Sequence, residues 1–205
     1  MTVTKLLACV IFIFLVLTAA HCSNSSTPSA QDACGFVQNT YGQRVSLKNA
    51  PPIKLYFDAN FPTQYYADVK TGIQTWETAI GHKVFDLQPE PLPASTPSQD
   101  GVSVIYWMES WDPTLASEQA NTTIYWDGDQ ITEADMKFDA ANYTISDNST
   151  STSVDMASLA LHELGHVLGL KHDDPDQSVM DAYLSDGFER RTLYSVDVSH
   201  IQCEY

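Results

Sequence analysis

The sequence predicts an α+β fold: a twisted sheet, two helices that pack against it and a C-terminal lobe made mostly of loop. Three observations predict this class. A strand-like segment precedes an amphipathic helical segment, several more strand-like segments follow, and a long apolar helical segment comes before a polar, loop-rich end. The sequence has no internal repeat, and residues 34–205 have the length of one domain, enough to bury about 70% of the unfolded surface.

The first residues have the pattern of a secretion signal rather than of a folded element. Lys5 precedes LLACVIFIFLVLTAA, an apolar run that has the length of a signal peptide and is too short for a membrane span. We therefore expect residues 1–21 to be a signal peptide. The polar residues 22–33 are expected to form a flexible tether.

Two processing routes are open at the end of this signal. Ala20 is a candidate end of a conventional cleavage site, whereas Cys22 is a candidate for lipidation as the first residue of a lipoprotein. We accordingly expect a secreted protein, or one anchored at the outside of a membrane through lipidated Cys22.

The net charge of the chain bears on its binding partners, and its cysteines bear on a disulfide. Without Lys5 the chain has nine basic and 26 acidic side chains, and this net charge of −17 argues against nucleic acid as a partner. Cys9 lies in the signal, which leaves an odd number of cysteines in an exported protein. If Cys22 carries lipid, Cys34 and Cys203 remain as a disulfide pair that joins the two ends of the domain.

The predicted elements begin with a strand and a helix. Residues 53–57, IKLYF, have the β-branched and aromatic content of a strand. Residues 65–81 predict an amphipathic helix that stops at Gly81. Its apolar side chains recur at helical spacing at Val69, Ile73, Trp76 and Ile80.

Four strand-like segments follow this helix. They are residues 83–87, 102–107 and 122–126 and a short segment around 136–138. A Pro-rich loop separates the first two. Residues 102–107, VSVIYW, are apolar on both faces, which is typical of a central strand.

Two further helices complete the predicted fold. SVDMASLALHELGHVLGLKH predicts a helix from near Ser153 to near Gly169, because no strand of that length is so continuously apolar. A polar loop follows it. Residues 195–205 then predict a short last helix with Ser195 as its N-cap.

The segment HELGHVLGLKH has the residue types and spacing of a zinc site. His162 and His166 are four residues apart on a helix, so both imidazoles face one side. Gly169 lets the chain leave the helix, and the turn brings His172 round as a third ligand. Three neutral nitrogens leave the fourth position of a zinc ion open for water, whereas structural zinc sites fill all four positions.

Glu163 is the predicted catalytic residue beside this site. Zinc lowers the pKa of its water toward neutrality, and Glu163 then takes the proton and passes it to the leaving amine. The alternative, that these histidines are ordinary core or surface residues, fits the complete spacing H-E-x-x-H-x-x-G-x-x-H poorly.

HELGHVLGLKH followed by SVM resembles the zinc-binding consensus and Met-turn of the metzincin peptidases. Met180 stands eight residues after His172, a spacing similar to that of the matrixin (matrix metalloproteinase-like) branch. IKLYFDANFP, the helix around Trp76, ITEADMKF and DVSHIQCEY also resemble matrixin segments in matrixin order, so the resemblance covers residues 50–205. It implies a metzincin fold: a twisted, mostly parallel sheet with an antiparallel edge strand, an active-site helix, a Met-turn and a small C-terminal lobe with a final helix.

The resemblance also implies an activity. Residues 34–205 are expected to form a matrixin-like zinc metallopeptidase domain, a monomer that hydrolyses peptide bonds in proteins or peptides. Met180 is expected to lie beneath the metal as a hydrophobic floor. The alternative is a catalytically silent protein of the same fold that binds a partner through its cleft, and the presence of Glu163 weighs against it. One catalytic zinc is expected on His162, His166 and His172.

Substrate recognition is implied in the same way. The substrate is expected to lie as an added strand along the edge strand 122–126, and a pocket beside the zinc selects one of its side chains. Ala182 stands where matrixins carry a proline, so the pocket wall is expected to differ, with Tyr183 as a candidate to line it.

The resemblance also bears on calcium, on a second zinc and on inhibition of the site by a cysteine. Matrixins often bind calcium, and a second, structural zinc is not expected because no histidine lies between His82 and His162. Cys34 is also a candidate zinc ligand in a short inhibitory segment, a role that competes with the disulfide. The candidate calcium ligands are Asp127, Asp129, Glu133, Asp135 and Asp155.

Overall fold

The computed structural model describes residues 32–148, 150–173 and 177–205. The predicted signal peptide, Cys22 and the tether up to residue 31 lie outside the described residues. No helix in the described part of the chain has the length and hydropathy needed to span a membrane.

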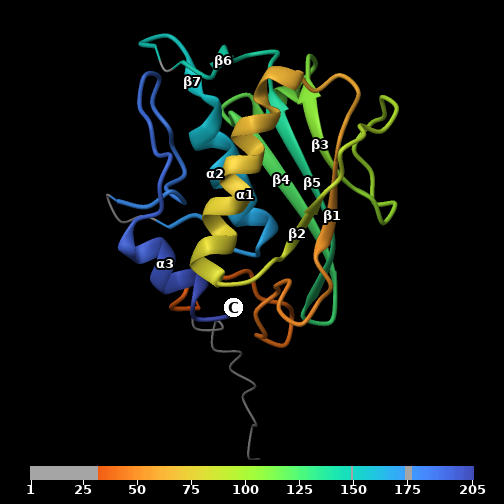
Figure 1. The fold of residues 1–205 in the computed structure, drawn as a ribbon, viewed down its shortest axis with the longest axis vertical. Coiled ribbons are helices and arrows are strands. Elements are labelled where there is room, and N and C mark those ends of the chain that lie inside the picture. The colour runs from red at the N-terminus through yellow and green to blue at the C-terminus, as the bar shows by residue number, and fades with distance from the viewer. Residues whose placement is uncertain (1–31, 149, 174–176) are drawn as a thin grey trace, which may run out of the picture. The chain divides into compact units, whose positions relative to one another are not determined.

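The described residues form a five-stranded sheet, a two-stranded sheet and three α-helices (Figure 1). The elements in chain order are β1 (Ile53–Phe57), α1 (Tyr66–Ile80), β2 (Phe85–Leu87), β3 (Ser103–Met108), β4 (Ala120–Asp127), β5 (Gln130–Asp139), β6 (Ile145–Ser146), β7 (Val154–Asp155), α2 (Met156–Val167) and α3 (Ser195–Ile201). Short 3-10 turns at Thr63–Tyr65 and Pro113–Leu115 precede α1 and β4.

The larger sheet confirms the predicted topology. Its strand order is β2-β1-β3-β5-β4. The first four strands in this order are parallel to their neighbours, and β4 pairs antiparallel with β5 at the edge. The segment predicted to be central, β3, lies in the middle of the sheet, and the first four of its side chains are buried.

Helices α1 and α2 pack against each other on one face of this sheet (Figure 1). The indole Nε1 of Trp76, a fully buried side chain of α1, donates a hydrogen bond to the carbonyl of Leu161 at 2.8 Å. Gly72 lets the two helices approach closely, because a Cβ there would lie 2.8 Å from Cδ1 of Leu164. Helix α2, which carries the first two predicted zinc ligands, is thereby held between α1 and the edge of the sheet.

Two element boundaries differ from the prediction in α2 and β5. Helix α2 begins at Met156 rather than near Ser153, because Asp155 is its N-cap and accepts a hydrogen bond from the Ser158 N–H at 2.8 Å. Strand β5 covers Gln130–Asp139 rather than a short segment around residues 136–138, because it pairs with β4 along its whole length.

The N-cap of α3 also differs from the prediction. Ser195 is the first residue of the helix, and Tyr194 is the N-cap. The reason is Asp197, whose buried carboxylate accepts the N–H of Tyr194 at 2.8 Å and so satisfies the start of the helix one residue earlier.

A disulfide joins Cys34 and Cys203, the pair that the sequence predicted, with the two Cα atoms 6.2 Å apart. Arg44 binds the same two ends of the domain. Its guanidinium donates to both carboxylate oxygens of Asp32 at 2.9 Å and to the carbonyl of Cys203 at 2.7 Å. Asp32, which the sequence assigned to the tether, is therefore held against the domain.

Candidate metal centre

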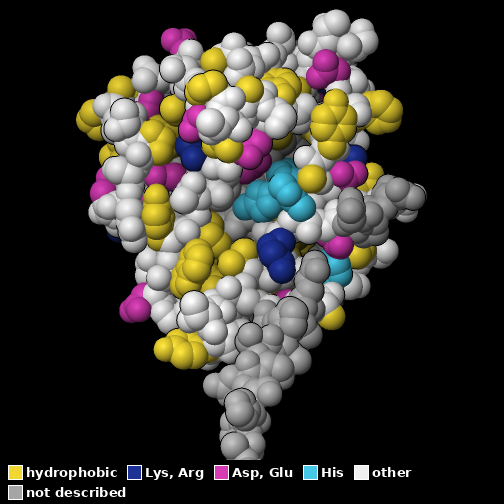
Figure 2. All heavy atoms as spheres, turned by 180° about the vertical axis from the view of Figure 1, so that it is seen from behind, with side chains coloured by type: hydrophobic (Ala, Val, Ile, Leu, Met, Phe, Trp, Pro, Cys, Tyr) yellow, Lys and Arg dark blue, Asp and Glu magenta, His cyan; other side chains and the backbone are white. Residues whose placement is uncertain are grey.

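Three histidines converge at the surface of the domain (Figure 2). His162 and His166 lie one turn apart on α2, and His172 follows this helix. Their ring centroids are 4.7–5.2 Å apart, and their ligand nitrogens all lie within 4.8 Å of one another. In the described part of the chain, no other cluster of metal-binding side chains comes this close together.

Backbone carbonyls fix the protonation of two of these rings. Nδ1 of His162 lies 2.7 Å from the Val179 carbonyl, and Nδ1 of His166 lies 2.8 Å from the Leu170 carbonyl. A carbonyl only accepts hydrogen bonds, so each Nδ1 carries the proton and each Nε2 has a free lone pair. These two Nε2 atoms are 3.0 Å apart. Two lone pairs at this distance repel unless a cation lies between them.

Zinc fits this donor set. Two imidazole nitrogens on one tetrahedral zinc lie about 3.3–3.4 Å apart, because each Zn–N bond is about 2.0–2.1 Å long. Burial lowers the pKa of His162 well below its usual value and lowers the pKa of His166 to about 4. Burial also lowers the pKa of the more exposed His172. All three rings therefore favour the neutral form, which is the form that binds metal.

The chain that leads to His172 is held by the N-terminal part of the domain. Gly169 leaves α2 with φ of 97°, a conformation that favours glycine. Leu170 then forms a bridge with Phe36, and the N–H of Lys171 donates to the carbonyl of Gly35 at 2.7 Å. Because the neighbouring Cys34 is bonded to Cys203, its alternative role as an inhibitory zinc ligand does not apply in this structure.

The turn around Met180 supports the first histidine. Asp197, 1% exposed, accepts the hydroxyl of Ser178 at 2.6 Å and the N–H of Val179 at 3.1 Å. The carbonyl of Val179 in turn orients His162. Met180 is buried under α2 in space left by a glycine, since a Cβ on Gly165 would lie only 2.3 Å from its sulfur. Asp197 thus reaches the metal centre through the backbone of the turn.

Glu163 is buried next to the three histidines and bonded to the edge strand. Its Oε2 accepts the hydroxyl of Thr122 on β4 at 2.6 Å, and its side chain is 3% exposed. Burial raises the pKa of Glu163 to about 7, although the Thr122 hydrogen bond acts in the opposite direction. A carboxyl group with this pKa accepts and releases protons near neutral pH, as a general base and acid must.

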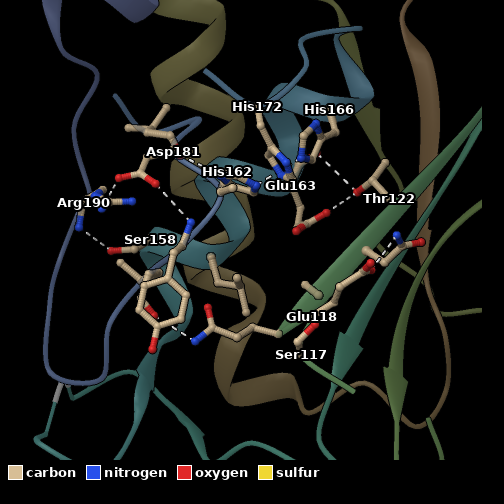
Figure 3. A pocket seen from close by; sticks show the side chains of 18 residues that line it. Ser117, Glu118, Thr122, Ser158, His162, Glu163, His166, His172, Asp181 and Arg190 are labelled. Carbon is tan, nitrogen blue, oxygen red and sulfur yellow. Dashed lines mark hydrogen bonds and ion pairs between the residues drawn. The ribbon is translucent and has the colours of Figure 1, made fainter. Parts of the chain in front are cut away.

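A cavity of about 430 Å³ opens beside the histidines (Figure 3). Glu163 and the three histidines lie in its wall, and so do Ala182 and Tyr183, the two positions that the sequence placed in the substrate pocket. Arg190 and Asp181 line one side and Thr122 and Glu118 the other (Figure 3). Tyr183 is 65% exposed, so it contributes to the rim rather than to the depth.

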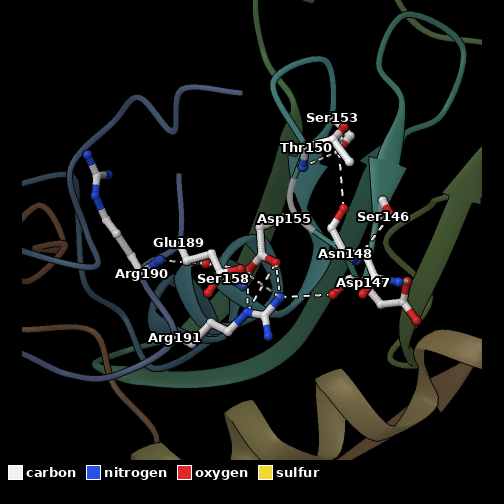
Figure 4. A network of polar contacts seen from close by, with 10 residues as sticks. All are labelled: Ser146, Asp147, Asn148, Thr150, Ser153, Asp155, Ser158, Glu189, Arg190 and Arg191. Atoms are coloured by element: carbon white, nitrogen blue, oxygen red, sulfur yellow. Dashed lines mark hydrogen bonds and ion pairs between the residues drawn. The ribbon is translucent and has the colours of Figure 1, made fainter. Parts of the chain in front are cut away.

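A network of ionic and polar contacts holds the loop that carries Arg190 (Figure 4). The guanidinium of Arg191 donates to both carboxylate oxygens of Asp155, which is fully buried at the start of α2. Arg191 also donates to the carbonyl of Asp147 at 2.9 Å. The backbone N–H of Arg190 donates to the hydroxyl of Ser158 at 2.6 Å. The loop is therefore tied to the first turn of the helix that bears the histidines.

The prediction of calcium gains no support from this structure. Asp155 is bound by Arg191, and Glu133 accepts the backbone N–H groups of Asp100 and Gly101. Asp135 accepts the N–H of Val104 at 3.2 Å. These three carboxylates therefore hold neighbouring loops and strands through hydrogen bonds.

Sequence reasoning missed four residues that shape the site: Thr122, Asp181, Arg190 and, in its contact with the turn, Asp197. Asp197 had a partial signal, because an acidic residue in the first turn of a helix is a capping candidate. Thr122 carried no signal in the sequence, because a threonine on an edge strand is ordinary.

Comparisons with known proteins agree with this geometry. The matrixin family model matches residues 112–205, which include β4, α2, all three histidines and α3. The chain is also similar to metalloendoproteinase 2-MMP of Arabidopsis thaliana, at 39% identity over 57 residues. That match covers 28% of this chain and 15% of the plant protein. With the sheet order and helices described above, the chain is matrixin-like in sequence and has an α+β fold consistent with that of the metzincins.

Proposed function

We propose that this matrixin-like chain is a zinc-dependent endopeptidase that hydrolyses peptide bonds in proteins. The observation that carries the proposal is the convergence of the histidines: the Nε2 atoms of His162 and His166 face each other at 3.0 Å, and a ring nitrogen of His172 lies within 4.8 Å of them, beside a buried carboxyl group. Packing alone does not require three imidazole nitrogens to converge. A zinc ion does, and three nitrogen ligands leave its fourth coordination position open.

The residues divide the chemistry among them. His162, His166 and His172 would hold the ion. When bound, zinc would supply a Lewis acid that polarises the scissile carbonyl and makes the attacking water more acidic. Glu163 accepts the proton from this water and then delivers it to the amine of the leaving product. Thr122 holds the carboxylate of Glu163 in place through a hydrogen bond of 2.6 Å.

The edge of the sheet supplies the place for a substrate chain. Strand β4 pairs with β5 and lies at the edge of the sheet, and residues 120–122 at its start line the cavity. We propose that an extended substrate pairs with this edge and that one of its side chains enters the cavity beside the histidines. Pairing of the backbone gives binding without regard to sequence, so the cavity supplies the selectivity.

Export is part of the same proposal and rests on the sequence of residues 1–33. The apolar run after Lys5 supports a signal peptide, and Cys22 supports a lipid anchor as one of two routes. Growth with a radioactive fatty acid would label the wild-type chain and leave a Cys22→Ser variant unlabelled if the anchor exists. Equal labelling of the wild type and the variant would refute a lipid anchor at Cys22.

The test of the mechanism is the Glu163→Ala variant. The variant should still fold and bind one zinc with unchanged affinity, because Glu163 is not a ligand. Its rate of peptide hydrolysis should fall by about three orders of magnitude or more, the range expected when a main catalytic group is lost. Turnover equal to that of the wild type would refute the role of Glu163. A wild-type chain that binds zinc and peptides without cleaving any would favour the catalytically silent alternative.

A further inference from the structure

We propose that the cavity beside the histidines selects a substrate side chain that carries a carboxamide, glutamine or asparagine, because Arg190 and Asp181 together present a donor and an acceptor in its wall. This inference rests on the proposed peptidase function. It names the chemical class of side chain that the cavity accepts.

The cavity joins an apolar wall to a charged pair. The apolar wall comes from α2 and from the segment after Met180, at Leu159, Val179, Ala182 and Leu184. Arg190 and Asp181 line the same cavity, and their ion pair joins Nη2 to Oδ2 at 2.8 Å (Figure 3). The wall of the cavity thus offers an entering side chain both aliphatic groups and a charged pair.

The ion pair leaves hydrogen-bonding capacity unused. Nη2 is the one guanidinium atom of Arg190 that has a hydrogen-bond partner within the described residues, so Nε and Nη1 remain as donors. Asp181 accepts the N–H of Tyr183 with Oδ1 and Arg190 with Oδ2, and each carboxylate oxygen has a second lone pair. The two side chains are 24% and 29% exposed, so a ligand can reach both.

A carboxamide matches this pair better than the other side chains do. Its oxygen accepts from Arg190, and its NH₂ group donates to Asp181. A carboxylate also accepts from Arg190, but Asp181 and the net charge of −16 on the chain repel it. An aliphatic side chain displaces water from both groups and returns no hydrogen bond, which a site built for hydrogen bonding penalises strongly.

The backbone that carries Arg190 is held in position by its neighbours. Its backbone N–H is bound to Ser158 at 2.6 Å, and the next residue, Arg191, is clamped to the buried Asp155 (Figure 4). Both partners lie within the first turn of α2 or at its N-cap, the helix that carries His162 and His166. The backbone that carries Arg190 is therefore fixed relative to the helix of the metal centre, and the ion pair with Asp181 orients the guanidinium, as selection of a side chain requires.

The experiment is cleavage of a randomised peptide library by the full-length, zinc-loaded chain, with the cleavage sites read by mass spectrometry. One position relative to the cleaved bond should be enriched in glutamine and asparagine. For matched peptides that differ only there, kcat/KM for glutamine should exceed kcat/KM for leucine by about tenfold or more. The ratio of two substrates on one enzyme does not depend on how much of the protein is folded.

Two variants assign this preference to the pair. Arg190→Leu should lower the glutamine-to-leucine ratio to about one or below, because the donors are gone. Asp181→Asn is the matched control: it keeps Arg190, so glutamine should still exceed leucine, while glutamate should rise relative to glutamine by about tenfold because the repelling carboxylate is removed.

Two results would overturn the inference: a wild-type preference for aliphatic side chains at every position, or the same glutamine-to-leucine ratio in Arg190→Leu as in the wild type. If the wild-type chain cleaves no peptide, the proposed function fails, and selectivity is then read from affinity selection of the library on the zinc-loaded Glu163→Ala protein. Enrichment of carboxamides that disappears when Arg190→Leu is added supports the inference in that case, and its absence refutes it.

Discussion

Gly169 is the point where the chain leaves α2 toward His172, and Gly169→Ala should damage both stability and zinc binding. The residue has φ of 97°, and a Cβ built on it lies 2.1 Å from the backbone oxygen of Val45. Val45 is fully buried, and its own N–H donates to the Val37 carbonyl at 2.8 Å. The obstructing atom therefore cannot rotate away as the end of a side chain does.

The cost has two parts. A side chain at this φ costs about 1–3 kcal/mol in backbone strain. Displacement of a packed backbone segment adds about 1–3 kcal/mol, as overpacking of a core does. The sum, about 2–6 kcal/mol, is a large part of the total stability of a domain, which is about 5–15 kcal/mol.

Zinc affinity should fall together with stability. Leu170, the next residue, provides the carbonyl that orients His166, and His172 follows two residues later. Loss of such an orienting contact lowers metal affinity by about 10–100-fold in other sites. The variant that still folds should therefore bind zinc at least about tenfold more weakly.

The assay is urea unfolding of the zinc-free protein, together with zinc titration against a competing chelator. Gly81→Ala is the matched control, because Gly81 has φ of 87° at the end of α1 and nothing lies within 4 Å of its built Cβ. The control isolates the cost of the backbone conformation. Equal losses of stability in the two variants, with zinc affinity unchanged in both, would refute the reasoning about Val45 and His172.

Three further predictions concern the disulfide, Thr122 and Asp135. The Cys34→Ser, Cys203→Ser double variant should lose about 2–5 kcal/mol of unfolding free energy in urea, because the disulfide closes a loop across a separation of 169 residues; an unchanged urea midpoint would count against this. Thr122→Val should lower kcat by about tenfold with zinc affinity and KM unchanged, because the hydrogen bond to Glu163 is lost. Thr122→Ser keeps the hydroxyl and should retain the wild-type kcat. A fully active valine variant would contradict this. Burial raises the pKa of Asp135 to about 6, so the folded state binds its proton more tightly than the unfolded state, and the stability gained below pH 4 is lost as the pH rises through 6. Asp135→Asn should remove this loss, so urea unfolding of the two proteins should favour the variant increasingly from pH 4 to 7; parallel pH profiles would show that Asp135 is not the cause.

The features that the sequence predicted well depend on local spacing. A separation of four residues on a helix determines that His162 and His166 share a face whatever the rest of the chain does. The continuous apolar run of β3 likewise predicted its central place in the sheet. The resemblance to matrixins added the antiparallel edge strand, which residue patterns alone did not indicate.

The features that the sequence did not predict depend on contacts between distant residues. Thr122 and Glu163 are 41 residues apart, and Asp155 and Arg191 are 36 apart. Neither pairing follows from local spacing. The first depends on how α2 packs against the edge of the sheet, and the second on how the loop before α3 returns to the start of α2. Asp155 was a candidate calcium ligand because carboxylate oxygens bind calcium. Nothing in the sequence indicated that Arg191 would bind this carboxylate instead.

The most direct test of the central claim is hydrolysis of a diverse peptide library by the purified chain, with and without a zinc chelator. The account predicts cleavage that stops when the chelator is added and returns when zinc is restored. Cleavage that continues in the chelator would contradict it, and so would a chain that retains one tightly bound zinc and cleaves no peptide.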